Sequence, residues 1–408
     1  MEIRPILSAM LRSKTGPVLI ALQIAITLAI VVNSAFIINQ RLEHMHRPTG
    51  MDHENLVFAR SYGFGPNHDT LATIREDIDA LLAMPGVRNA AYISGIPLSG
   101  SGSNSGFLPH PPEGENDPDS TNANYYNGDH RLAEALGLRI IEGRWFHPEE
   151  IEFDPTDTSY GAMPKVVVVT RAWADAAFGE GEPVVDRLVY DSIGRSARII
   201  GVIEHMQGAW VNWDELDQVI ILGNISAAHS VITYAINVEP GQKERLIPEI
   251  EAKLQEINRN RVVLSVRAHT DYIASSYNTD SAMIQMLSSV SVLLIAVTAL
   301  GVVGLAAFNV NQRRKQIGTR RALGARRVDI LRYFLVESLL IAAIGIVLGI
   351  VLAFGMSWWL GVQFNLPQLD WKFVPPVVLG VLIISQLAVL GPARRAMRIS
   401  PAMATRSV

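Results

Sequence analysis

The chain has 408 residues, 49% of them hydrophobic, and its mean hydropathy of +0.21 lies between that of a soluble protein and that of a membrane bundle. It contains no cysteine, which excludes disulfides, a thiolate nucleophile and a cysteine-ligated zinc site. The net charge of −4 hides a segregation, because residues 39–282 carry 35 acidic side chains, 19 basic ones and all ten histidines, whereas the rest of the chain is basic. Bases confined to short loops between apolar runs argue against a nucleic-acid-binding protein.

Four apolar runs, each close to the roughly 20 residues that cross a bilayer as a helix, predict four membrane spans. We place these spans at residues 17–38, 283–310, 331–360 and 373–391. The first run follows basic residues and could be a signal peptide. Its apolar core is longer than such peptides have, however, and no small-residue cleavage site follows it, so an uncleaved span is favoured.

Basic residues set the predicted orientation. They gather in three segments, residues 1–16, 311–330 and 392–408. The loop 361–372 carries only Lys372. The positive-inside rule therefore places both termini and the segment 311–330 in the cytoplasm, and residues 39–282 outside, in the periplasm if the cell has an outer membrane.

The external segment has the pattern of an α/β domain. Near each of its ends a strand pattern, an amphipathic helix pattern and a second strand pattern follow one another. These elements are Asn55–Tyr62, Thr70–Met84 and Val87–Ser94, and then Val231–Val238, Lys243–Arg259 and Val262–Val266. Such a pair can form a split βαβ sandwich from about residues 50–95 and 226–270. Residues 96–225 would then be an inserted subdomain, in which the Gly-, Ser-, Pro- and Asp-rich stretch 100–120 predicts a mobile loop.

The residues offer little chemistry. The pattern G-x-x-x-x-G-K-[ST] is absent, so these 408 residues are not expected to hydrolyse ATP. We find no nucleophile–base set and expect no catalytic residue. His44, Met45, His46 and His53 could bind copper, but solvated polar residues beside a membrane are the favoured interpretation, and no metal site is assigned.

The most informative segment is residues 311–337. Its basic residues could serve only to fix the orientation of the chain in the membrane. Its apolar side chains, interrupted by Gly318 and Gly324, favour instead a short helix that docks onto another protein. Glu337 follows near the membrane entry of the third span, where a carboxylate needs a partner, and Arg332 or Arg327 could supply one. A structural anchor is the favoured role for Glu337, and a direct role in movement is the alternative.

At this segment the chain resembles the MacB/FtsX-like permeases of mechanotransmitting ABC systems. The resemblance is carried by residues 313–325 (RRKQIGTRRALGA), by Ile330, Phe334 and Glu337, and by the tail 392–402. Gln316 stands where the family usually has glutamate. Weaker motifs of the external segment, such as Gly137-Leu138 and the run from Glu142 to Phe146, occur in the expected order.

The resemblance implies a permease subunit without catalytic residues of its own. Two permease chains would pair in the bacterial inner membrane, as a homodimer or a heterodimer, and two copies of a separate ABC ATPase would dock beneath them and bind ATP and Mg²⁺. The external domain would have a porter-like subdomain, and it could contact a periplasmic adaptor or hydrolase. The residues implied in coupling are Arg313, Arg314, Gln316, Ile317, Gly318, Arg320, Arg321, Ala322, Leu323, Gly324 and Ala325.

Three functions fit this sequence. The first is ATP-driven export or extraction of a periplasmic substrate. The second is mechanical regulation of a periplasmic cell-wall hydrolase. The third is an ATP-independent membrane receptor, which is disfavoured because each cytoplasmic piece is too small for a signalling enzyme. The substrate cannot be inferred from these residues.

Overall fold

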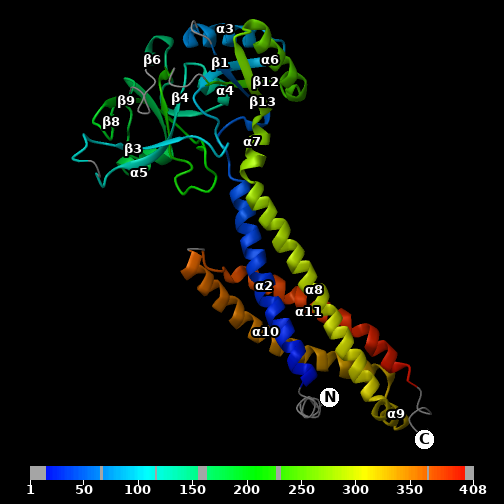
Figure 1. The fold of residues 1–408 in the computed structure, drawn as a ribbon. Coiled ribbons are helices and arrows are strands. Elements are labelled where there is room, and N and C mark those ends of the chain that lie inside the picture. Colours follow the sequence, from blue (N-terminus) through cyan, green and yellow to red (C-terminus); the bar gives the residue numbers. More distant parts are fainter. Residues whose placement is uncertain are drawn as a thin grey trace. The chain divides into compact units, whose positions relative to one another are not determined.

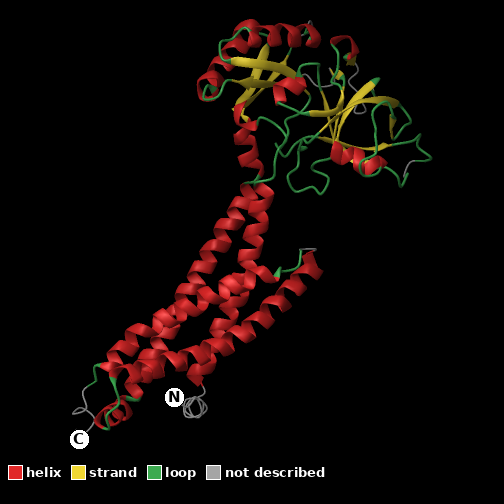
Figure 2. Cartoon of the chain, turned by 180° about the vertical axis from the view of Figure 1, so that it is seen from behind, coloured by secondary structure: helices red, strands yellow, loops and turns green. Residues whose placement is uncertain are grey.

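The computed structural model describes residues 15–64, 68–114, 117–154, 163–226, 231–364 and 367–399. It divides into two compact units (Figures 1 and 2). The helical unit comprises the chain up to His46 and from Asp280 onward, and the head comprises Arg47–Thr279.

The helical unit contains four helices long and apolar enough to cross a membrane. Its helices are α2 (Thr15–Met45), α8 (Asn278–Gln312), α9 (Arg314–Ala322), α10 (Arg327–Phe364) and α11 (Val374–Met397). The prediction of four apolar helices is confirmed, and each helix extends beyond the apolar run that predicted it. In this unit the start of α2, the short helix α9 and the end of α11 lie toward the same end (Figure 1).

Polar contacts and close packing join the long helices. The side chain of Asn33 on α2 donates a hydrogen bond to the carbonyl of Ala353 on α10 (3.1 Å), and the hydroxyls of Thr27 on α2 and Thr298 on α8 are 2.8 Å apart. Such bonds hold apolar helices together where lipid supplies no hydrophobic driving force. At the other end of α2 from Thr15, Arg41 forms an ion pair with the buried Asp280 of α8 (2.9 Å).

The head contains a four-stranded antiparallel sheet in the order β13-β1-β12-β2, with helices α3 and α6 packed on it. These elements are β1 (Leu56–Gly63), α3 (Thr70–Leu82), β2 (Val87–Ile93), β12 (Val231–Val238), α6 (Lys243–Ile257) and β13 (Arg261–Ala268). Apolar side chains recur at helical spacing, such as Ile74, Ile78 and Leu81 on α3, and they fill the core between helices and sheet. The Asp69 side chain caps α3 by accepting a bond from the amide of Ala72.

The second sheet of the head has seven strands in the order β5-β9-β7-β10-β4-β3-β8. An additional pairing of β8 with β9 closes six of these strands into a ring around an apolar core that includes Trp173. Its elements are β3 (Ser103–Leu108), β4 (Thr121–Asn127), β5 (Ile140–Gly143), β7 (Val166–Thr170), α5 (Arg171–Phe178), β8 (Leu188–Asp191), β9 (Ser196–Ile203) and β10 (Val219–Leu222).

Shorter elements complete the described chain. They are α4 (Leu132–Leu136), α7 (His269–Ser276), the 3-10 turns His53–Asn55, Pro148–Glu150 and Trp371–Phe373, and the two-stranded sheet of β6 (Glu152–Asp154) and β11 (Asn224–Ser226). The prediction of a loop over residues 100–120 is wrong for residues 103–108. Residues 103–108 form β3, because their backbone groups pair with both β4 and β8 despite a Gly- and Ser-rich composition.

Candidate functional site

The candidate site is the short helix α9 between the long helices α8 and α10 (Figure 1). Ile317 and Gly318 are buried, and Ile317 joins the apolar core of the helical unit. Arg314, Gln316 and most other residues of α9 are exposed. One face of α9 therefore packs inward while the other remains free to contact another molecule.

A glycine ends α9 and sets the turn into α10. The amide of Ala325 donates to the carbonyl of Arg320 (3.0 Å), and the amide of Gly324 donates to that of Arg321 (3.2 Å). This is the Schellman motif, which places a left-handed residue just past a helix end, and Gly324 has a φ of +97°. The turn leaves Leu323 84% exposed, the highest value among the large apolar side chains of the described residues.

Arg321 ties α9 to the end of α11. Its Nη1 donates to the carbonyls of Met397 (3.1 Å) and Ile399 (2.6 Å). The last carbonyls of a helix have no partner within the helix and carry partial negative charge, so an arginine is well suited to this position. The basic residues of this segment thus include at least one with a packing role inside the protein.

Glu337 on α10 pairs with Arg313, the residue that immediately precedes α9. The Nη1 of Arg313 lies 3.1 Å from Glu337 Oε2 and 2.9 Å from the hydroxyl of Tyr333. The prediction that Arg332 or Arg327 pairs with Glu337 is therefore wrong. Glu337 points inward, where its residue is 3% exposed, whereas Arg327 and Arg332 are exposed, so the partner comes from the turn between α8 and α9.

Tyr333 is a site residue that the sequence analysis missed. Its ring lies 5.8 Å from the guanidinium carbon of Arg313 and 5.2 Å from that of Arg320, distances at which cations are attracted to an aromatic face. Tyr333 and Glu337 are four residues apart on α10 and so share one helix face. An aromatic residue four positions before a glutamate in an apolar run was the available signal.

A small cavity of about 30 Å³ adjoins Glu337 within the helical unit. It is lined by Asn309, Ser338 and apolar side chains of α2, α8, α10 and α11. The second carboxylate oxygen of Glu337, Oε1, is buried and makes no hydrogen bond within the described chain. The cavity is large enough for a water molecule, which could complete the hydrogen bonding of this oxygen.

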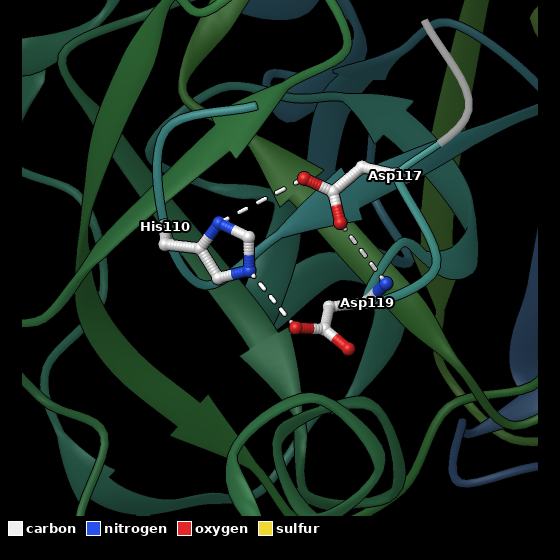
Figure 3. A group of neighbouring side chains, drawn as sticks. All are labelled: His110, Asp117 and Asp119. Carbon is white, nitrogen blue, oxygen red and sulfur yellow. Dashed lines mark hydrogen bonds and ion pairs between the residues drawn. The ribbon is translucent and has the colours of Figure 1, made fainter. Parts of the chain in front are cut away.

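A histidine and two aspartates meet in the head, on the loop between β3 and β4 (Figure 3). The two carboxylates face different nitrogens of the His110 ring: Asp119 is 3.1 Å from Nε2, and Asp117 is 3.9 Å from Nδ1. Nδ1 also lies 3.0 Å from the carbonyl of Pro111, to which it can only donate. With Nδ1 donating to this carbonyl and Nε2 facing a carboxylate, the arrangement suits a protonated imidazole that donates from both nitrogens.

The histidines near the first span make local contacts. The Nδ1 of His46 is 2.7 Å from the carbonyl of Leu42, a local contact on the last turn of α2. Among the described residues, His44 and His46 belong to no cluster of three metal-ligating side chains. The structure therefore adds no support for copper at this position.

Two family models match the chain. One, described as the MacB-like periplasmic core domain, matches residues 18–268, and the other, the FtsX-like permease C-terminal domain, matches residues 288–401. The first match alone covers more than half of the chain.

Individual relatives are more distant. The chain is 27% identical over 266 residues to "Macrolide export ATP-binding/permease protein MacB" of Wolinella succinogenes, covering 62% of this chain and 40% of that protein. It is 25% identical over 371 residues to a protein of the same name from Brucella abortus, covering 86% of this chain and 51% of that one. The chain thus spans about half the length of the relatives it matches. Among solved structures, the periplasmic region of MacB from Actinobacillus actinomycetemcomitans is 14% identical, with a TM-score of 0.33, covering 55% of this chain and 94% of that one.

Proposed function

The chain belongs to the MacB/FtsX-like permeases of ABC transporters, and from this premise we propose that it couples ATP hydrolysis in a separate ATPase chain to movement of its periplasmic head. The output of that movement would be export or extraction of a periplasmic substrate. The inner membrane is the proposed location, with α9 on the cytoplasmic side. The four-stranded sheet with α3 and α6 would be the porter-like subdomain.

One observation carries the coupling part of this proposal. Leu323 stands 84% exposed at the end of a nine-residue helix whose opposite face is packed into the helical unit. Exposed arginines precede and follow it in the chain, at Arg320 and Arg326, and Gly324 fixes the turn that presents it. A large apolar side chain held on a rigid turn in a basic segment is suited to insertion into a shallow groove of a partner.

The relatives support the choice of partner. The two MacB proteins named above are described as ATP-binding and permease proteins, whereas the P-loop pattern is absent from these 408 residues. We propose that ATP and Mg²⁺ bind to a separate ATPase, present in two copies beneath two permease chains. In this arrangement, the ATP-driven closure of the two ATPase subunits would act on α9.

The test is purification of the tagged chain from native membranes in mild detergent, followed by mass analysis of the intact complex. Leu323→Glu should lose a co-purifying ATP-hydrolysing subunit, and Arg314→Glu, which changes another exposed residue of α9, should weaken its binding. Leu188→Glu is the matched control, because Leu188 is also exposed but lies in the head. Full ATPase binding and activity with Leu323→Glu would refute the coupling assignment.

The same purification separates the alternative outputs. A cell-wall hydrolase bound to the head would favour mechanical regulation of that enzyme over export. A complex without any ATPase would favour the receptor hypothesis. Gly324→Glu is a poorer test than Leu323→Glu, because a side chain at a φ of +97° strains the backbone whatever it contacts.

A further inference from the structure

We infer that Tyr333 and Glu337 are positioning residues that clamp α9 onto α10, so that a displacement of α9 is passed to α10. This inference rests on the proposed function for its purpose, since coupling requires α9 to move another helix. The contacts that carry it lie within the helical unit and do not depend on any partner.

The first argument is the convergence of two arginines on one ring. Arg313 precedes the first residue of α9, and Arg320 lies in its last turn, yet both guanidinium groups lie within 6 Å of the centre of the Tyr333 ring. Arg313 also bonds to the Tyr333 hydroxyl and to Glu337. One side-chain pair on α10 therefore holds α9 near both of its ends.

The second argument is the burial of the ion pair. The side chain of Glu337 is 4% exposed and that of Arg313 is 18% exposed. A carboxylate so far from water is strongly destabilised when it loses its partner, so separation of α9 from α10 at this point is opposed. The contact therefore resists pulling more than an exposed ion pair would.

The third argument is that α9 cannot hold its own position. A nine-residue helix is not stable alone, so its placement depends on the contacts it makes. Arg321 reaches backbone carbonyls at the end of α11, whereas Arg313 and Arg320 reach side chains of α10, a 38-residue helix. Helix α10 is thus the element that best transmits a displacement along its length.

The first arm of the test uses the isolated chain. Because the protein has no cysteine, spin labels can be placed on Thr319→Cys in α9 and Val351→Cys in α10, two exposed positions, without removing any native thiol. The chain is diluted with unlabelled chain so that only intramolecular distances are measured. Tyr333→Leu should broaden the distance distribution, Tyr333→Phe should broaden it less because the ring remains, and Glu337→Gln should broaden it through loss of the ion pair.

The matched control is Arg332→Gln, which removes an exposed charge from the position next to Tyr333. It should leave the distribution unchanged. If Tyr333→Leu and Glu337→Gln also leave it unchanged, the clamp does not exist.

The second arm adds the co-purified ATPase and a non-hydrolysable ATP analogue. Labels on Leu300→Cys in α8 and Val351→Cys in α10 report movement between two long helices, and both positions are exposed. We expect a nucleotide-dependent shift in the unmodified chain. In Tyr333→Leu we expect loss of that shift when it is measured on complexes in which the ATPase remains bound, whereas the control Arg332→Gln should keep the shift.

The outcomes distinguish the two ideas. If the unmodified chain binds no ATPase or shows no shift, the proposed function fails, and the first arm still decides whether the clamp exists. If the unmodified chain shifts and Tyr333→Leu shifts equally, the clamp does not transmit movement and this inference is overturned.

Discussion

Asp77 and Arg261 form a two-pronged ion pair in the interior of the head. The two nitrogens of Arg261 lie 2.5 and 2.7 Å from the two oxygens of Asp77, and both side chains are at most 1% exposed. Tyr234 donates a further bond to Asp77. The pair joins helix α3 to the first residue of β13, elements almost 200 residues apart in the chain.

Breaking this pair should destabilise the head strongly. Asp77→Asn leaves the Arg261 guanidinium buried without its counter-charge, and such losses destabilise proteins by roughly 3–5 kcal/mol. Hydrogen exchange of the β1 and β12 amides in the full chain measures the change. The paired replacement Asp77→Leu with Arg261→Met should cost less than Asp77→Asn alone. If the paired replacement instead lost more stability than Asp77→Asn, the ion pair would have to stabilise the fold by more than it costs to bury its two charges.

His269 should make the head sensitive to acid. Burial lowers the pKa of this imidazole from its ordinary 6.5 to about 4, although its Nε2 donates a bond to the carbonyl of Pro97. The folded head therefore binds fewer protons than the unfolded chain between these values, and its stability falls as the pH falls from 6.5 to 4. At 1.36 kcal/mol per pKa unit the loss is roughly 3 kcal/mol.

His269→Gln isolates this effect, because its amide can donate to the same carbonyl and does not titrate. We expect the unfolding free energy of the variant to decline less between pH 6.5 and 4, measured by denaturant titration at several pH values. Parallel curves for the two proteins would mean that His269 is hydrated in the folded state.

His110 should titrate above its ordinary value. A hydrogen bond to the Pro111 carbonyl and a second to Asp119 raise the pKa of its imidazole. The stabilisation that the protonated imidazole gives the folded head is therefore fully present below pH 6.5 and is lost as the pH rises through the raised pKa. Histidine-labelled NMR of the full chain should show Asp119→Asn lowering this pKa without restoring 6.5, because the Pro111 bond remains. Glu251→Gln, an exposed charge change on helix α6 of the other sheet's layer, should leave it unaltered, and an unshifted pKa in Asp119→Asn would contradict the pairing.

Helices α2 and α10 should separate if bulk is added between them. A Cβ on Gly345 would lie 2.7 Å from the carbonyl oxygen of Ala21, and one on Gly349 would lie 3.0 Å from that of Ala25. Gly349→Val should therefore destabilise the helical unit by about 1–3 kcal/mol. A Cβ on Gly355 of the same helix would meet no atom within 4 Å, so Gly355→Val is the control. Denaturant titration in mild detergent compares them, and equal losses would point to helix propensity instead of packing.

Much of the fold was predictable because it depends on local pattern. Apolar length alone identified the four long helices, and helical spacing identified α3 and α6. The prediction that failed concerned residues whose structure depends on strands distant in the sequence. Residues 103–108 become a strand through pairing with β4 and β8, and their composition gave no sign of it.

The candidate site shows the same limit. The segment 313–325 could be located from its bases and glycines. The partner of Glu337 was sought among arginines near it in sequence, whereas the fold supplies Arg313 from 24 residues away. Which nearby arginine reaches a buried carboxylate depends on how helices pack, and no spacing rule reports that.

Connectivity gives the Arg41–Asp280 pair a mechanical meaning. Strand β1 follows α2, strand β13 leads through α7 into α8, and β1 and β13 are hydrogen-bonded neighbours whose connected ends, at Val57 and Ala268, are opposite each other. The Arg41–Asp280 ion pair joins the end of α2 to the start of α8, the two segments through which the chain enters and leaves the paired strands. It therefore opposes slippage of α2 along α8 within the helical unit.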